Sequence, residues 1–450
     1  MSSKLIFVFL ILIISLHVLI FTKLIYFPYP ELFINPYLTN HGLKPYSQIL
    51  DQHFPGLMFL PVNLNNLGMT TVETARVWSI SIVILIQLML FFVGSKILKS
   101  KTKAILVNIL YLIWQPFFEG WVLWIESFLP LLLLPASYAL YKKKFFVTGI
   151  LLGLAVVVKQ TIVPLSALVL IYTFWTERSF KYSLNFLFGL IIPISLMVIY
   201  LVSIGVFKDF WYWTIVYNLS TYAQSGTKAP PSIGYISRIV IIYGASLFAL
   251  LDRKKSIVFI LLIFVAGALI GALERADFVR LQSSLPFVIL ATVYGCGKLG
   301  KFGKWGGLGI KIGYLAALVW WLNIFYKGHL GNRVIAFDPD TQELAVKIRN
   351  YTSPREKIFV YGAAPQLYQM SGTLPAGNIF VFQFPWFMQV AENRILEGIK
   401  KDQPEIVISD ESVVIEGAKI VDFARDIDQY IQSNYQKIDS VGTAEILQRK

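Results

Sequence analysis

The chain has 450 residues, of which 56% are hydrophobic and only 15% charged, with a formal net charge of +14. Its mean hydropathy of +0.63 excludes an ordinary soluble domain of this length. The single cysteine, Cys296, excludes an intrachain disulfide framework and any site with several cysteine ligands. The basic residues lie in short runs between hydrophobic stretches, so the positive charge does not indicate binding to nucleic acid.

Apolar stretches long enough to cross a bilayer recur along the first three quarters of the chain. The first, residues 5–24, is too long for a signal-peptide core and lacks a small-residue cleavage pattern, so it predicts a retained helix. Ten more predicted spans follow at 77–97, 104–118, 121–140, 145–158, 161–176, 182–205, 233–251, 256–273, 282–297 and 309–325. The third and fifth of the eleven are short for a hydrocarbon core of about 30 Å, which suits tilted helices or a re-entrant pair.

Basic residues fill alternate connections between the predicted spans. These runs lie at 96–103, 142–144, 178–181, 253–255 and 298–304. The positive-inside rule places them in the cytoplasm, together with the N-terminus, and makes them topological anchors. An odd number of spans then places the long loop 25–76 and the C-terminal tail outside the cytoplasm, whereas an even number would place the tail inside. We therefore predict a multi-pass protein of the cell membrane with an extracytoplasmic C-terminal domain.

The tail is a different kind of protein, because the hydrophobic spans stop and the charge density rises from about Asp338. Amphipathic helices are predicted at 340–349, 391–401 and 418–435, and strands at 357–361, 405–409 and 444–447. Alternating helices and strands favour a small α/β layer. The tail contains no GxGxxG motif and no P-loop, so we assign it no nucleotide site. The predicted architecture is an all-α membrane bundle at 1–331, with 25–76 as its large first outer loop, and a soluble α/β domain at 332–450.

Ionisable side chains gather in the first outer loop, where acids and imidazoles beside a membrane are costly to desolvate. Glu31 lies close to the end of the first span, and Asp51 and His53 follow before a Pro-Gly pair at 55–56. The same residues also suit an ordinary solvated loop, in which proline and glycine mark turns. Glu31, Asp51 and His53 can supply ligands to a divalent metal ion, although their spacing is not diagnostic of one.

Further polar residues fall at the predicted outer ends of later spans. Glu126 lies inside an apolar run, so its carboxylate must face protein or water rather than lipid. Lys159, followed by Gln160, separates two apolar runs and either serves a site or extends its ammonium group to the membrane surface. The planar guanidinium groups of Arg275 and Arg280, which precede Gln282, either bind phosphate or cap the ends of spans.

Carboxylates and cations at one membrane face suit a transfer reaction. A carboxylate can take the proton of an acceptor hydroxyl group, and cations can neutralise a phosphate leaving group. This division of roles fits transfer from a lipid-phosphate donor that is held at the membrane surface.

In the order of these motifs the chain resembles the bacterial polytopic glycosyltransferases with the GT-C fold. This group includes the family 39 protein O-mannosyltransferases and the lipid A aminoarabinose transferases. The matching pattern consists of Glu31, the Gly-Leu-Lys-Pro-Tyr of 42–46, Asp51, His53 and the Pro-Gly of 55–56. Further matches are Glu126, Lys159 with Gln160, the segment 280–286 and the segment 354–362.

The resemblance implies a polyprenyl-phosphate-linked sugar as donor, a glycan, lipid or protein as acceptor, and transfer on the extracytoplasmic face of the bilayer. It gives Glu31 the position of the catalytic acid in the first outer loop, with Asp51 as the second catalytic candidate. The implied substrate-binding residues are Tyr46, His53, Glu126, Lys159, Gln160, Arg275, Arg280 and Gln282. Some members of the group use a divalent metal ion near the acids.

Two other functions are compatible with the sequence. A transporter or flippase of a lipid-linked intermediate would also use broken helices and charges inside the membrane. A non-catalytic assembly protein would use the outer domain to bind a partner.

Overall fold

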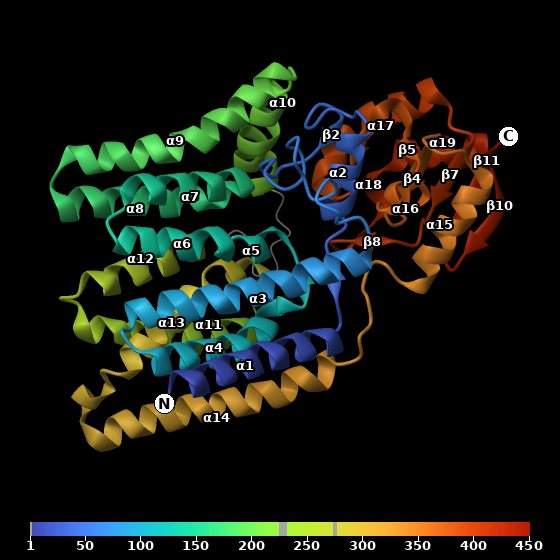
Figure 1. The fold of residues 1–450 in the computed structure, drawn as a ribbon. Helices are drawn as coiled ribbons and strands as arrows, with labels where there is room; N and C mark the ends of the chain where they lie inside the picture. The colour runs from blue at the N-terminus through green and yellow to red at the C-terminus, as the bar shows by residue number, and fades with distance from the viewer. Residues whose placement is uncertain (1, 225–231, 273–276) are drawn as a thin grey trace. The chain divides into compact units, whose positions relative to one another are not determined.

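The computed structural model describes residues 2–224, 232–272 and 277–450, and the chain forms two compact units (Figure 1). The helical unit comprises Met1–Phe27, Ala75–Met197 and Lys228–Arg333. The mixed unit comprises Pro28–Thr74, Val198–Thr227 and Val334–Lys450. The long first loop therefore belongs to the same compact unit as the C-terminal α/β segment.

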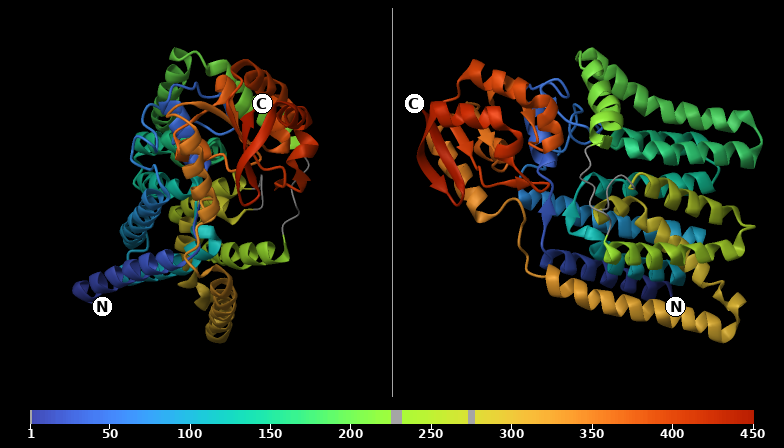
Figure 2. Two further views of the ribbon diagram at one scale, coloured as in Figure 1. Left: turned by 90° about the vertical axis from the view of Figure 1, so that its right-hand side faces the viewer. Right: turned by 180° about the vertical axis from the view of Figure 1, so that it is seen from behind.

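A helix lies at each of the eleven predicted spans, and the helices of the helical unit run side by side (Figures 1 and 2). They are α1 (Ser3–Lys23), α3 (Val72–Ile97), α4 (Lys101–Gln115), α5 (Ile125–Phe128), α6 (Pro130–Tyr141), α7 (Phe145–Val158), α8 (Val163–Glu177), α9 (Phe180–Ser203), α11 (Ile233–Ser246), α12 (Ser256–Ile270), α13 (Leu285–Cys296) and α14 (Gly303–His329). Among the described residues, five helices are long and apolar enough to cross a membrane, at Lys4–Lys23, Val72–Ile97, Phe180–Ser203, Ile233–Asp252 and Leu299–His329. The bundle of apolar helices is thus present, and the number of eleven spans stays a prediction.

Glycines let two of these helices approach closely. A Cβ atom on Gly149 of α7 would lie 2.1 Å from the carbonyl oxygen of Phe186, and one on Gly189 of α9 would lie 2.2 Å from that of Phe146. Small residues at such positions allow backbones to touch where no hydrophobic force drives helices together in lipid. The close contact of α7 with α9 therefore requires glycine, which has no side chain, at both positions.

A buried polar network joins α1, α3 and α4. His17 Nε2 lies 3.0 Å from Gln115 Oε1, and Gln87 Nε2 lies 3.0 Å from His17 Nδ1. Asn108 Nδ2 donates to the Gln87 backbone carbonyl at 2.7 Å and also to its side chain. Because an amide oxygen only accepts and an amide nitrogen only donates, these contacts require the neutral imidazole of His17 with its proton on Nε2.

Replacing His17 by leucine is expected to lower the unfolding midpoint of the protein in detergent. The change removes the donor to Gln115 Oε1 and one of the acceptors of Gln87 Nε2, which costs about 1–3 kcal/mol in total. Leu16→Ala is the matched control, because Leu16 is 47% exposed on the same helix. Equal midpoints for the two variants would contradict a stabilising role for the network.

The mixed unit is built around a five-stranded sheet with the order β10-β11-β7-β4-β5. Its strands are β4 (Lys357–Tyr361), β5 (Leu374–Pro375), β7 (Ile406–Ser409), β10 (Tyr435–Val441) and β11 (Ala444–Arg449). Strand β4 runs parallel to both β5 and β7, whereas β11 runs antiparallel to β7 and to β10. The helices are α15 (Pro339–Tyr351), α16 (Leu367–Ser371), α17 (Pro385–Asp402), α18 (Ile420–Phe423) and α19 (Arg425–Asn434).

A helix or a strand lies at each position predicted in the tail, with one correction and several elements that were not predicted, among them α16 and β5. The single helix predicted at 418–435 is interrupted at Ala424, whose φ of −131° and ψ of 48° are not helical. Strand β10 was not predicted, and it forms a hairpin with β11 around Gly442, whose φ is +57°.

The long first loop is integrated into this unit by backbone pairing. It contains helix α2 (Glu31–Asn40) and the short strand β2 (Ile49–Leu50), which runs parallel to β6 (Phe380–Val381). The Tyr37 hydroxyl group donates to the carbonyl oxygen of Thr373 at 3.1 Å. The segment 198–227 adds a hydrogen bond of 2.9 Å from the Tyr217 hydroxyl group to the Trp386 carbonyl oxygen. The polar loop is therefore an ordered part of the mixed unit.

Candidate functional site

Glu31 is the first residue of α2 and is half-buried, while the next residues of the helix, Leu32, Phe33 and Ile34, are fully buried. Burial raises the pKa of the Glu31 carboxyl group to about 8, and the negative charge of Asp51 adds to this effect. A carboxyl group with such a pKa exchanges its proton near neutral pH, which is the range required of a general acid or base.

Asp51 is buried and both of its carboxylate oxygens are occupied. Oδ1 accepts a hydrogen bond of 2.7 Å from the backbone N–H of His53 and lies 2.9 Å from Nδ1 of the same residue. Oδ2 accepts a hydrogen bond of 2.9 Å from Nδ2 of Asn35. Asp51 therefore orients the His53 ring and is itself held by α2, which is a positioning role.

Tyr46 supports the same loop. Its hydroxyl group donates to the His53 carbonyl oxygen at 2.9 Å, and its buried ring packs edge-on against Phe210. Its backbone has a φ of +63°, and its N–H donates to the carbonyl oxygen of Ile49 at 2.8 Å. Asn218 Nδ2 donates to the carbonyl oxygen of Gln52 at 3.1 Å, which fixes the loop from a third segment of the mixed unit.

Removing the Asp51 side chain is expected to destabilise this loop. Asp51→Ala removes the carboxylate acceptor of the buried Asn35 amide and the Asp51 contact of the His53 ring, which costs about 1–3 kcal/mol. Asp51→Asn keeps one acceptor oxygen and is expected to lose less. Thermal unfolding of the two variants at pH 7 measures the difference, and a midpoint unchanged in Asp51→Ala would contradict the positioning role.

Glu126 and Lys159 meet in the interior of the helical unit. The Lys159 ammonium group donates to Glu126 Oε1, and both side chains are almost fully buried. The Lys159 Nζ also lies 6.0 Å from the centroid of the Trp124 ring. The other carboxylate oxygen of Glu126, Oε2, has no hydrogen-bond partner among the described residues. Glu126 thus faces protein, as its sequence position requires, and Lys159 is buried rather than extended to a membrane surface.

The remaining predicted residues of the helical unit lie in short helices that interrupt the bundle. Gln160 begins the 3-10 helix Gln160–Ile162, directly after Lys159. Arg280 and Gln282 belong to the 3-10 helix Phe278–Ser283. Gln282 Nε2 donates to the carbonyl oxygen of Gln115 at 3.1 Å, and Arg280 Nε lies 3.8 Å from Asp277 Oδ2. Arg275 lies outside the described residues.

Glu119 is a further acid in this region. It has a φ of +57°, and its Oε2 accepts a hydrogen bond of 3.0 Å from the backbone N–H of Val279. Burial raises the pKa of the Glu119 carboxyl group, and the nearby charge of Arg238 opposes that shift. Arg238 itself lies 4.2 Å from the Phe117 ring centroid and 4.6 Å from that of Phe278. In the sequence, this cluster is indicated by the aromatic run at 117–121, which contains Glu119.

The predicted site residues thus form two groups in two units. Glu31, Tyr46, Asp51 and His53 belong to the mixed unit, and Glu126, Lys159, Gln160, Arg280 and Gln282 belong to the helical unit. Across 2–224, 232–272 and 277–450 no group of three or more His, Cys, Asp or Glu residues is arranged to hold a metal ion. The described side chains therefore do not fit the divalent metal that some members of the resembled group use.

Of the comparisons with known proteins, the one with solved structures gives matches. No protein-family model matches the chain, and no curated protein matches it. Eleven chains of solved structures do match, among them the archaeal oligosaccharyltransferase AglB from Archaeoglobus fulgidus, in complex with an inhibitory peptide and a dolichol-phosphate. The sequence identity is 11% and the TM-score 0.45, over 85% of this chain and 65% of AglB, so this chain spans less than two thirds of the length of AglB.

At this identity and TM-score, the match assigns no activity to this chain and no role to any of its residues.

Proposed function

We propose that the protein is a membrane glycosyltransferase that moves a sugar from a polyprenyl-phosphate donor to an acceptor hydroxyl group on the extracytoplasmic face. The observation that carries this proposal is the carboxyl group of Glu31, which has a pKa of about 8 and interacts with the charge of Asp51. Asp51 in turn forms an ordered pair with His53. The motif order in the first outer loop supports the same reaction class.

Glu31 is the proposed general base. Its carboxylate takes the proton of the acceptor hydroxyl group as the acceptor oxygen attacks the anomeric carbon of the sugar. The bond from that carbon to the phosphate oxygen breaks, and polyprenyl phosphate leaves with the bonding electron pair. The products are the glycosylated acceptor, the lipid phosphate and protonated Glu31.

Asp51 acts through its neighbours in this proposal. Its charge raises the pKa of Glu31, and its hydrogen bonds fix the ring of His53 close to α2. His53, whose side chain is 15% exposed, is the proposed substrate-binding residue of the pair. Asp51 is thus reassigned from catalysis to positioning.

In the helical unit, Arg280 is the proposed ligand of the donor phosphate. Its guanidinium group can form two hydrogen bonds to a phosphate group. Lys159 suits this role less well, because its side chain is only 2% exposed and already donates to Glu126, whereas the Arg280 side chain, 3.8 Å from Asp277, is 10% exposed. We therefore propose that Lys159 and Glu126 hold the ends of α5 and α7 together.

The direct test is transfer from a panel of polyprenyl-phosphate sugars by the purified full-length protein in lipid nanodiscs. The expected result is release of polyprenyl phosphate with at least one sugar and an added hydroxyl acceptor. Mass spectrometry of the lipid that co-purifies with the protein would identify the donor class. Lipid flipping in reconstituted vesicles without any sugar transfer would refute the proposal in favour of a flippase.

A further inference from the structure

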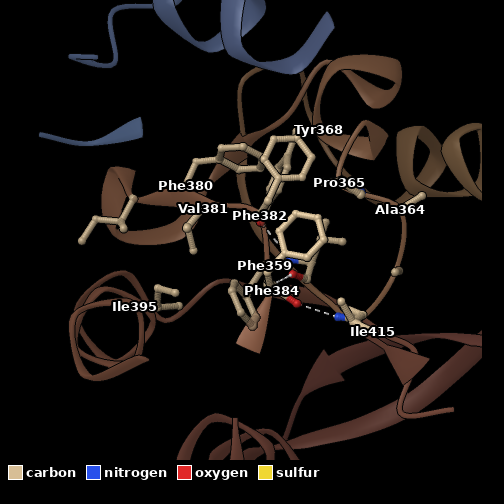
Figure 3. A pocket seen from close by; sticks show the side chains of 15 residues that line it. Phe359, Ala364, Pro365, Tyr368, Phe380, Val381, Phe382, Phe384, Ile395 and Ile415 are labelled. Atoms are coloured by element: carbon tan, nitrogen blue, oxygen red, sulfur yellow. Dashed lines mark hydrogen bonds between the residues drawn. The ribbon is translucent and has the colours of Figure 1, made fainter. Parts of the chain in front are cut away.

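The mixed unit contains a pocket of about 230 Å³ that none of the predicted site residues lines (Figure 3). Its wall consists mainly of aromatic and aliphatic side chains, including Phe359, Tyr368, Phe382, Phe384 and Ile395. No charged side chain lines it. The pocket is therefore suited to an uncharged, apolar group.

The pocket lies where α/β sheets commonly bind ligands. In the sheet, β4 lies between β5 and β7 and is parallel to both. The chain continues from β4 to β5 on one side, whereas after β7 it continues to the strands on the opposite side, β10 and β11. Connections that leave neighbouring parallel strands in opposite directions open a crevice beyond their carboxyl ends. The segment 362–365, which follows β4 directly, and Ile415, which follows β7, both line the pocket.

Gly362 is required for this geometry. Its φ is +69°, and a Cβ atom there would lie 2.2 Å from the carbonyl oxygen of Asp410. Only glycine lets the loops after β4 and β7 approach so closely. The crevice is thus a consequence of the strand order and of this one residue.

The polar groups around the pocket are already paired with one another. Gln383 Oε1 accepts a hydrogen bond of 2.8 Å from the Gly362 N–H, and its Nε2 donates to the Val360 carbonyl oxygen at 2.7 Å. The Tyr368 hydroxyl group accepts a hydrogen bond of 2.9 Å from the Val360 N–H. A sugar or a peptide backbone needs new partners when it is buried, whereas a hydrocarbon needs none.

The size of the pocket and the access to it suit the end of a hydrocarbon chain rather than a single small ring. An engineered apolar cavity of about 150 Å³ is large enough for benzene, and this pocket is larger at about 230 Å³. Its rim includes the half-buried residues Ala363, Ala364 and Pro365 and the short hairpin of β8 (Val414–Ile415) and β9 (Ala418–Lys419). Val414 is 57% exposed while Ile415 lines the pocket, so the hairpin covers the crevice from one side.

We propose that this pocket binds the aliphatic chain end of a lipid. The aromatic lining, the paired polar groups of Gln383, Gly362 and Tyr368, and the volume carry the inference. The same chain also has helices that are long and apolar enough to cross a membrane. The pocket shares no residue with the Glu31 group, so the inference does not depend on the proposed transfer reaction.

Photo-crosslinking of the full-length protein in nanodiscs tests the proposal. The probe is a benzophenone-bearing prenyl alcohol, and peptide mass spectrometry locates the labelled residues. We expect labelling within 359–365 or 379–384 that an excess of unmodified alcohol abolishes. Competition by farnesol but not by dodecanol would identify an isoprenoid chain, and the reverse would identify an acyl chain.

The matched variants are Ala364→Trp, which fills the pocket from its rim, and Val390→Trp, which adds the same ring at a position of α17 that is 43% exposed. Each buried methylene group is worth about a fourfold gain in affinity, so exclusion of two of them is expected to weaken labelling about 15-fold in Ala364→Trp alone. Ala363→Trp replaces Ala364→Trp if the latter fails to unfold cooperatively. Labelling outside these segments, unchanged labelling in the filled pocket, or competition only by an aromatic peptide would overturn the proposal.

Discussion

Replacing Glu31 by glutamine is expected to lower the rate of sugar transfer by about 10²- to 10⁴-fold, the usual contribution of a positioned general base. Glutamine keeps the size of the side chain and removes its ability to accept a proton. Single-turnover measurements with saturating donor and acceptor would separate this loss from weaker binding. Glu73→Gln is the matched control, because Glu73 is an exposed acid of the same outer segment.

The pH dependence provides a second readout of the same residue. A general base must be ionised, so with a pKa of about 8 the activity of the wild-type protein rises through a midpoint at about pH 8 and levels off at higher pH. Asp51→Asn removes the negative charge that raises this pKa, so the midpoint of the profile is expected to move to lower pH. A profile that keeps its midpoint in Asp51→Asn, or full activity in Glu31→Gln, would remove Glu31 from the proposed role.

Stability is expected to change in the opposite direction to activity. The pKa of Glu31 is raised from 4.5 to about 8 on folding, so the folded state binds the proton more tightly than the unfolded chain between these values. Stability therefore falls as the pH rises through this window, by at most about 1.4 kcal/mol per pH unit. Glu31→Gln removes this cost, and its unfolding midpoint is expected to exceed that of the wild type at pH 8 but not at pH 4.

The sequence was informative where one physical signal dominates. Long apolar runs leave a backbone in lipid no alternative to helix, and a helix lies at each predicted span. In the tail, the buried strand at 357–361 and its terminal Gly362 follow from composition alone. Strand β10 was not predicted because polar residues lie on both sides of Ile438 at its centre, so the segment shows no apolar alternation.

The partners of the site residues depend on contacts that no local pattern specifies. Asn35 holds Asp51 because α2 places it one turn after Glu31, and helical periodicity in 31–40 is the signal that would have found it. That signal is obscured by Pro36 inside the helix. The His17 network depends on how three helices are rotated about their axes, which the sequence of each helix does not define. The pairing of Glu126 with Lys159 likewise joins residues from two different helix ends.

The buried pair of Glu126 and Lys159 leads to the largest expected effect on stability. Lys159→Met removes the cation and leaves a carboxylate in the interior, where Oε2 already has no partner among the described residues. Breaking a buried ion pair in this way costs about 3–5 kcal/mol. The surface pair of Lys143 and Glu177 is the matched control, because Lys143 is 67% exposed and Lys143→Met is expected to cost less than about 1 kcal/mol.

The double variant Glu126→Leu/Lys159→Met separates structure from function at this pair. Replacing both charges by apolar side chains of similar size removes the desolvation cost, so most of the lost stability is expected to return. If the pair only holds α5 and α7 together, sugar transfer returns with stability. If the pair also binds substrate, as the resemblance implies, the double variant regains its unfolding midpoint and stays inactive. Unfolding midpoints and transfer rates measured on the same four proteins, the wild type, the two single variants and the double variant, decide between these outcomes.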